Sequence, residues 1–188
     1  MPATLITAND AIAATELWLE KAVIGLNLCP FAKAVQVKQQ IRFVFSEAKT
    51  PDELLQDVVK ELELLAEANP EKIETSILIH PYVLTDFLDY NDFLDVADAA
   101  LQELDLDGIL QIASFHPDYQ FAGTEPDDID NFTNRSPYPC LHLIREESID
   151  RAVAAFPDAD MIYEKNIQTM RDLGLDGWRK LFPSTRKK

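Results

Sequence analysis

Residues 41–80, IRFVFSEAKTPDELLQDVVKELELLAEANPEKIETSILIH, decide the fold. The run Ile41–Phe45 alternates in polarity and is rich in β-forming residues, which predicts a strand. At residues 50–53 a threonine N-cap precedes proline at the first helical position, and glutamate follows three residues on, so a helix begins there. This helix carries one apolar stripe up to Asn69-Pro70, and Ser76–His80 is the next strand. Strand, helix and strand in this order predict a parallel β-α-β unit.

The same alternation continues toward the C-terminus. Apolar residues at helical spacing follow Asp86 as far as Gly108, and residues 109–115 form a third strand. Residues 118–138 contain no periodic segment, which marks a long loop of the kind that carries function. A fourth strand, residues 141–144, can then join the sheet antiparallel. Ser148 caps a helix to about Phe156, and a last helix spans residues 161–173 and ends near Gly174.

At the N-terminus, helical spacing runs from Thr7 or Asn9 to about Leu28, where Cys29-Pro30 interrupts it and a turn or second helix begins. We therefore predict a single α/β domain over residues 1–188, with its core at about 10–175 and a flexible tail at 184–188. Its sheet has about four strands, is mostly parallel and is built from β-α-β units, with additional N- and C-terminal helices. Whether helices cover one or both faces stays open.

Composition excludes several classes of protein. Lysine and arginine number 17 against 33 acidic residues, a net charge of −16, so phosphate backbones and anionic membranes would repel the chain. We expect neither a nucleic-acid nor a membrane partner. No apolar run has membrane length and the N-terminus lacks a basic leader, so we expect a cytoplasmic protein. Two cysteines lie far apart in the sequence, which predicts two thiols and no disulfide framework.

Two of the three histidines end strands in the same way, in Ile79-His80-Pro81 and Phe115-His116-Pro117. If both strands are parallel, His80 and His116 emerge at the carboxyl edge of the sheet, where open α/β sheets place ligands. The alternative is that each imidazole caps a loop carbonyl. The third histidine, His142, alternates with leucines in the last strand and faces either a pocket or a partner surface. The spacing of these histidines is not that of a metal site, so we predict none.

Cys29 has two interpretations. At the C-terminal end of the first helix, the helix dipole disfavours a thiolate and the cysteine fills the core. As the N-cap of a turn starting at Pro30, its sulfur faces free backbone amides with Lys33 nearby, and it ionises more easily. Both interpretations stay open.

Arg135 is the first basic residue after residues 73–134, which hold 14 acidic residues and no lysine or arginine. Its planar guanidinium can clamp a carboxylate or phosphate with two hydrogen bonds. Alternatively, it pairs with the neighbouring acids Asp127, Asp128 or Asp130.

Five blocks of the sequence together resemble one family: GLNLCPFA (25–32), YNDFL (90–94), HPDYQFAGT (116–124), NRSPYP (134–139) and LHLIREES (141–148). They are similar to the bacterial domain of unknown function family 1415, over residues 10 to about 175. The resemblance implies a single-domain bacterial protein and indicates no reaction, cofactor or catalytic residue.

Three functions are consistent with these residues. An enzyme acting on a small anionic metabolite would use Cys29 as nucleophile, His116 as base and Asn134 to orient it, with Arg135, His80 and His142 binding the substrate. A non-catalytic protein would hold a small anionic molecule in the same edge pocket. In the third, the acidic surface docks a basic protein. The enzyme is the leading hypothesis; cofactor, substrate and oligomeric state stay open.

Overall fold

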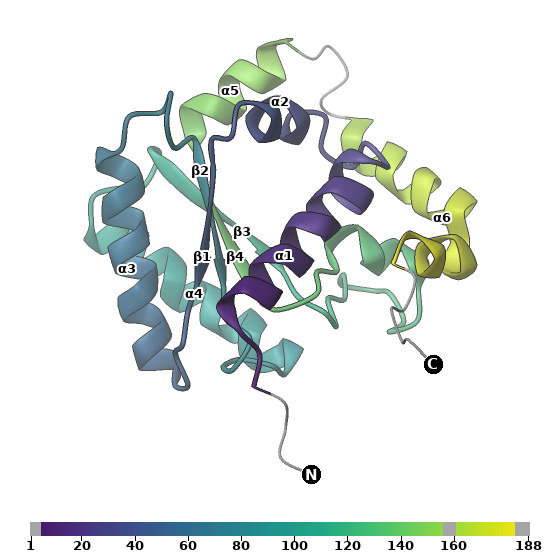
Figure 1. Ribbon diagram of the computed structural model, residues 1–188, viewed down its shortest axis with the longest axis horizontal. Coiled ribbons are helices and arrows are strands. Elements are labelled where there is room, and N and C mark those ends of the chain that lie inside the picture. Colours follow the sequence, from purple (N-terminus) through teal and green to yellow (C-terminus); the bar gives the residue numbers. More distant parts are fainter. Residues whose placement is uncertain (1–4, 156–160, 183–188) are drawn as a thin grey trace.

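The computed structural model describes residues 5–155 and 161–182, and its centre is one four-stranded sheet (Figure 1). The strands are β1 (Ile41–Phe45), β2 (Thr75–Ile79), β3 (Leu110–Phe115) and β4 (Cys140–Arg145), in the spatial order β1-β2-β4-β3. All four agree with the predicted strands to within one residue at each end. The predicted tail at 184–188 and the end of the helix at Phe156 lie outside the described residues.

The direction of β4 makes the sheet mixed. β1 pairs parallel with β2, whereas β4 pairs antiparallel with both β2 and β3. The first three strands therefore run in one direction, as the β-α-β pattern predicts, but the prediction of a mostly parallel sheet is wrong. The reason lies in residues 116–139, which contain no crossover helix. The chain leaves β3 at the carboxyl edge and re-enters from the same edge, so β4 has to run back between β2 and β3.

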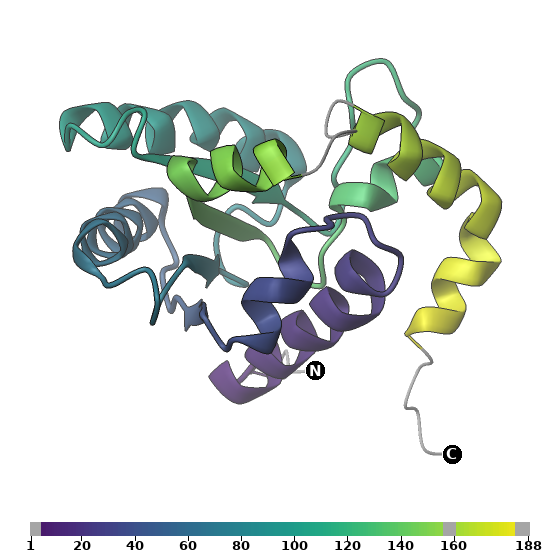
Figure 2. The same ribbon diagram turned by 90° about the horizontal axis from the view of Figure 1, so that it is seen from above.

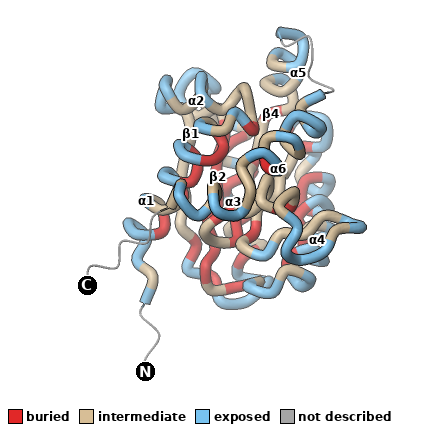
Figure 3. The backbone as a smooth tube through the Cα atoms, turned by 90° about the vertical axis from the view of Figure 1, so that its right-hand side faces the viewer, coloured by how far each residue is buried: buried red, intermediate tan, exposed pale blue. Residues whose placement is uncertain are grey.

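Helices α3 (Pro51–Glu67) and α4 (Phe87–Glu103) cover one face of the sheet and close it with a continuous apolar core. Both begin as predicted: Thr50 and Glu53 form a capping box, and Asp86 accepts hydrogen bonds from two backbone amides. Because side chains alternate along a strand, Leu78, Leu141 and Leu143 all point to this face. In Figure 3 the buried segments lie mainly in the interior of the molecule, and the exposed segments lie on its outside.

The opposite face is covered by α1 (Ala8–Trp18) and its continuation η1 (Leu19–Ile24), a π-helix. The sheet therefore has helices on both faces, as Figure 1 shows, with α3 and α1 on opposite sides. The predicted helix to Leu28 is too long. The chain turns after Gly25 and forms the short helix α2 (Ala32–Val37).

Three further helices follow in the second half of the chain: η2 (Ile129–Asn134, a 3-10 helix), α5 (Glu146–Ala155) and α6 (Ile162–Leu181). α6 packs on η2 (Figure 2). There Trp178 contacts Phe132, and Arg171 binds Asp130. Gly174 has a φ of 64° and interrupts α6 at the predicted position. None of the residues in α2 and α5 is buried, although both helices lie beside the sheet. Their inner sides border a cavity.

Candidate functional site

The cavity lies on the α1 face of the sheet and has a volume of about 960 Å³. It is partly open to solvent and extends from the middle of the sheet toward the amino ends of β1 and β2. Strand residues form its floor, η1 and the residues before α2 form one wall, and α2 and α5 form the others. Most of the lining is apolar, including Leu19, Phe31, Ile41, Ile77 and Ile149.

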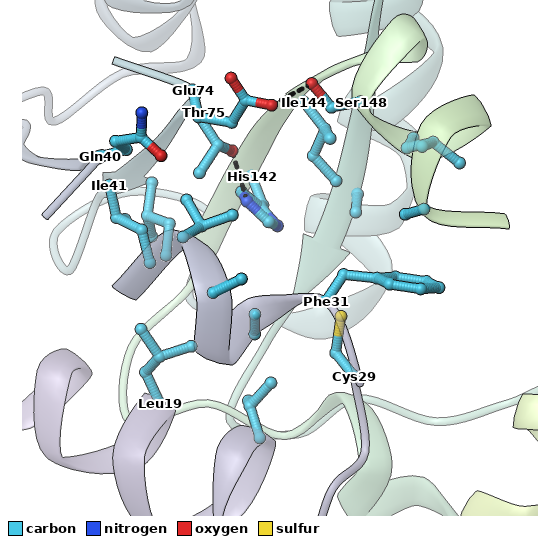
Figure 4. Close-up of a pocket in the computed structure, with 18 of the residues that line it drawn as sticks. Leu19, Cys29, Phe31, Gln40, Ile41, Glu74, Thr75, His142, Ile144 and Ser148 are labelled. Atoms are coloured by element: carbon cyan, nitrogen blue, oxygen red, sulfur yellow. Dashed lines mark hydrogen bonds between the residues drawn. The ribbon is translucent and has the colours of Figure 1, made fainter. Parts of the chain in front are cut away.

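His142 lies at the floor of this cavity beside Thr75 (Figure 4). In the register of the sheet it lies between Ile77 of β2 and Ala113 of β3, on the face opposite Leu141 and Leu143. Of the two alternatives for His142, a pocket or a partner surface, the structure therefore shows a pocket. Its Nε2 lies 2.6 Å from the hydroxyl oxygen of Thr75. Burial lowers the pKa of His142 to about 4, because the charged ring loses its hydration.

A polar group also lies at the rim. The Ser148 hydroxyl donates a hydrogen bond to Glu74, and Arg151 donates to the same carboxylate oxygen at 2.9 Å. Arg151 also binds Glu147 on its own helix at 2.8 Å. Glu74 precedes β2, whereas Ser148 and Arg151 belong to α5, so these bonds connect α5 to the sheet beside the cavity. Figure 4 shows the bond between Glu74 and Ser148.

Cys29 lines the same cavity and is half-buried, with its thiol free. Cys29 precedes α2 but is not its N-cap, as one interpretation had it, since the N-cap of α2 is Phe31. Its backbone carbonyl still accepts a hydrogen bond from Ala32, so the residue belongs to the entry turn of that helix. Cys29 and His142 are the predicted site residues that line this cavity.

His80 and His116 meet at the carboxyl edge, as predicted from their strand ends, but on the α4 side. The rings of both stack or tilt against Tyr90, with centroid distances of 5.7 Å and 5.0 Å. Phe115 points to the α1 side, where it contacts Trp18, so the next residue along the strand points away. His116 therefore lies on the other face of the sheet from Cys29.

Both edge histidines are fully buried, and three of their four ring nitrogens form hydrogen bonds within the fold. His116 Nδ1 accepts from the Asp118 amide, so its Nε2–H donates to the Leu84 carbonyl at 3.2 Å. His80 Nδ1 donates to Val83, and its Nε2 is buried without a hydrogen-bond partner. Burial lowers the pKa of His80 to about 4 and also lowers that of His116. These contacts agree with the alternative that each imidazole caps a loop carbonyl.

Asn134 and Arg135 organise the long loop. Asn134 donates to the Ser114 carbonyl at 3.2 Å. Arg135 donates to the carbonyl oxygens of Tyr119 and Pro126, and its guanidinium lies 4.2 Å from the Phe132 ring centroid. Burial lowers the pKa of Arg135, although nearby carboxylates act in the opposite direction. Among the described residues, Asp130 is paired with Arg171 and not with Arg135.

The structure thus divides the predicted site residues among three places: the cavity, the edge cluster around Tyr90 and the loop. Their catalytic and binding roles stay predictions. Sequence reasoning missed Thr75, Glu74 and Ser148. The sequence signal for Thr75 was that a polar residue directly precedes the predicted strand. Its position opposite Ile144, and so next to His142, follows only once β4 is known to be the neighbour of β2. Within residues 5–155 and 161–182, no group of three histidine, cysteine or acidic side chains could hold a metal ion.

Comparison with known proteins identifies the family. The model described as "Protein of unknown function (DUF1415)" matches residues 10–180, which confirms the resemblance of the five sequence blocks. No curated protein and no solved structure matches the chain. Over the described parts of the chain, no helix has the length and apolar character needed to cross a membrane.

Proposed function

We propose that this chain, which belongs to the DUF1415 family of proteins of unknown function, binds a small amphipathic molecule in the cavity between the sheet, α2 and α5. The observation that carries the proposal is an apolar cavity of about 960 Å³ with an imidazole at its floor. Small-molecule sites typically have 300–1,000 Å³, a mainly apolar lining and a few polar groups that fix orientation.

The cavity supports this proposal better than the carboxyl edge supports an enzyme. At the edge, His116 bonds to the chain through both ring nitrogens, and His80 is fully buried. Arg135 donates to two loop carbonyls. In the cavity, by contrast, α2 and α5 leave apolar sheet residues uncovered, and a bound molecule would remove this surface from water. This proposal differs from the leading sequence hypothesis, which was an enzyme. It shares only non-catalytic binding with the second hypothesis, because the place is the α1 face and the ligand is amphipathic, not anionic.

A fluorescent apolar dye tests the proposal. N-phenyl-1-naphthylamine should bind the folded protein saturably at one site, with increased fluorescence. Ala152 lines the cavity on α5, so Ala152→Trp should weaken binding about tenfold or more by filling part of the space. Ala154, two positions along the same helix, is exposed and does not line the cavity.

Ala154→Trp is therefore the matched control and should bind the dye like the wild type. Circular dichroism of both variants checks that α5 still forms. Binding that does not saturate, or equal affinity in both variants, would contradict a site in this cavity.

A further inference from the structure

The hydrogen bonds of Thr75 determine which nitrogen of His142 carries the proton. The Thr75 hydroxyl oxygen lies 2.6 Å from the Leu143 carbonyl oxygen and 2.6 Å from His142 Nε2. A hydroxyl has one hydrogen, and a carbonyl oxygen can only accept. Two acceptors at 2.6 Å would repel each other, so Thr75 donates to Leu143. It then accepts from His142, whose Nε2 carries the hydrogen.

The other ring nitrogen is consequently an acceptor that faces the cavity. Figure 4 shows it on the far side of the ring from Thr75, directed into the space between the sheet and Phe31. Among the described residues, the imidazole ring of His142 has one hydrogen bond, the bond to Thr75. Its neighbours on the floor are Ile77, Ala113 and Ile144, whose side chains cannot donate a hydrogen bond.

The charges around the cavity favour a neutral head group at this nitrogen. Of the charged residues that line the cavity, Lys38 and Glu71 are exposed to solvent, and Arg151 lies at the rim, where Glu74 and Glu147 bind it. A carboxylate placed on the floor would meet the lone pair of His142 and lose its hydration without a paired cation, which is costly. A hydroxyl or an amide N–H can donate to the nitrogen at no such cost.

We infer that the molecule bound in this cavity is a neutral amphiphile whose hydroxyl or N–H group points inward and donates to Nδ1 of His142, with its apolar body against the walls. This inference rests on the proposed function and specifies its ligand class. Thr75 acts as a positioning residue, because its hydrogen bond fixes the tautomer that exposes an acceptor.

Three naphthalenes of similar size separate the head-group chemistries: 2-naphthol donates a hydrogen bond, 2-methoxynaphthalene only accepts, and 2-naphthoate is an anion. Calorimetry at pH 7.5 should show 2-naphthol binding about tenfold more tightly than 2-methoxynaphthalene, the effect of one hydrogen bond to an otherwise unpaired acceptor. 2-Naphthoate should bind most weakly. In ¹⁵N-labelled protein, 2-naphthol should shift the unprotonated ring nitrogen of His142.

Two variants test the roles of the residues. His142→Leu should abolish the preference for 2-naphthol while keeping the affinity for 2-methoxynaphthalene. Thr75→Ser keeps the hydroxyl and should keep the preference, whereas Thr75→Val should reduce it and change the tautomer signals of His142. Equal binding of the three compounds, or tightest binding of 2-naphthoate, overturns the inference and leaves the proposed cavity site standing. If neither the naphthalenes nor the dye bind, the proposed function and this inference both fail.

Discussion

At the scale of the residue, the surroundings of the three histidines determine how far each imidazole is buried and what it contacts. His80 and His116 follow strands at the carboxyl edge and are enclosed by Tyr90 and the α4 side of the sheet. His142 points the other way from its leucine neighbours and meets a cavity. The strand ends predicted that His80 and His116 lie at the carboxyl edge, and alternation indicated that His142 points away from its leucine neighbours; whether it meets a pocket was left open. The degree of enclosure depends on residues far away in sequence, and no local pattern indicates it.

The two cysteines differ in access in a way that chemical labelling can measure. Cys140 is fully buried, its thiol donates to the Tyr138 carbonyl, and burial raises its pKa to about 12. Cys29 is half-buried and lines the cavity. Iodoacetamide at neutral pH should therefore label Cys29 in the folded protein and leave Cys140 unmodified, since the thiolate is the reacting form.

Mass spectrometry of tryptic peptides would identify the labelled residue, and labelling in urea gives the reference for full access. Modification of Cys140 at the rate of Cys29 in the native protein would contradict this burial. The dye of the preceding proposal should slow labelling of Cys29 if both occupy the cavity.

At the scale of the element, the starts of α3 and α4 and the positions of the strands were predictable because capping residues and alternation act locally, whereas Ser148, predicted as a cap, lies inside α5. Thr50 with Glu53, and Asp86, start α3 and α4 where their sequences indicate. The position of β4 was not predictable in the same way, because it depends on where the loop after β3 returns the chain. Arg135 is important for that return, since it connects residues 119 and 126 of the loop.

Removing the guanidinium of Arg135 should loosen the loop. Arg135→Lys keeps the charge but cannot reach both carbonyls with a planar fork, so we expect a loss of about 1–2 kcal/mol in the free energy of unfolding. Cleavage by a low concentration of chymotrypsin at the loop aromatics Tyr119 and Phe121 should also become faster. Urea unfolding and mass spectrometry of the fragments measure the two effects.

Arg171→Lys is the control, because Arg171 pairs with Asp130 of the same loop but is exposed, and its loss should have a smaller effect. Equal effects of the two substitutions would mean that the hydrogen bonds of Arg135 add nothing to the loop. Anion binding by Arg135, which the sequence also suggests, is a separate prediction. Thermal shifts with phosphates and carboxylates at constant ionic strength test it.

At the scale of the whole molecule, the two faces of the sheet are closed to different extents. The α3 and α4 face is sealed by a continuous apolar cluster, whereas α1, α2 and α5 leave a cavity over the other face. The sequence predicted helices flanking the sheet, but it could not indicate that α1, η1, α2 and α5 would leave part of this face uncovered. The cavity arises from that arrangement, and so the sequence pointed to the carboxyl edge instead.

The lowered pKa values of the three histidines make the stability of the protein depend on pH in a predictable way. An imidazole in the unfolded chain has a pKa of about 6.5, whereas those of His80 and His142 are about 4 in the folded protein. Between these values the unfolded state binds more protons, so the free energy of unfolding falls as the pH drops from about 6.5 to about 4. From pH 7 to pH 5 each of the two histidines should cost up to about 2 kcal/mol, and His116 acts in the same direction.

Urea unfolding at the two pH values measures the total loss, to which carboxylates also contribute. The comparison with His142→Leu isolates one imidazole, because the variant should lose less stability between pH 7 and pH 5 than the wild type. Proton NMR gives an independent check, since the ring signals of His80 and His142 should not titrate above pH 5. Titration of all three histidines near pH 6.5, or the same acid sensitivity in the variant, would show that these rings are hydrated in solution and that the cavity floor is not the low-dielectric environment derived from its lining.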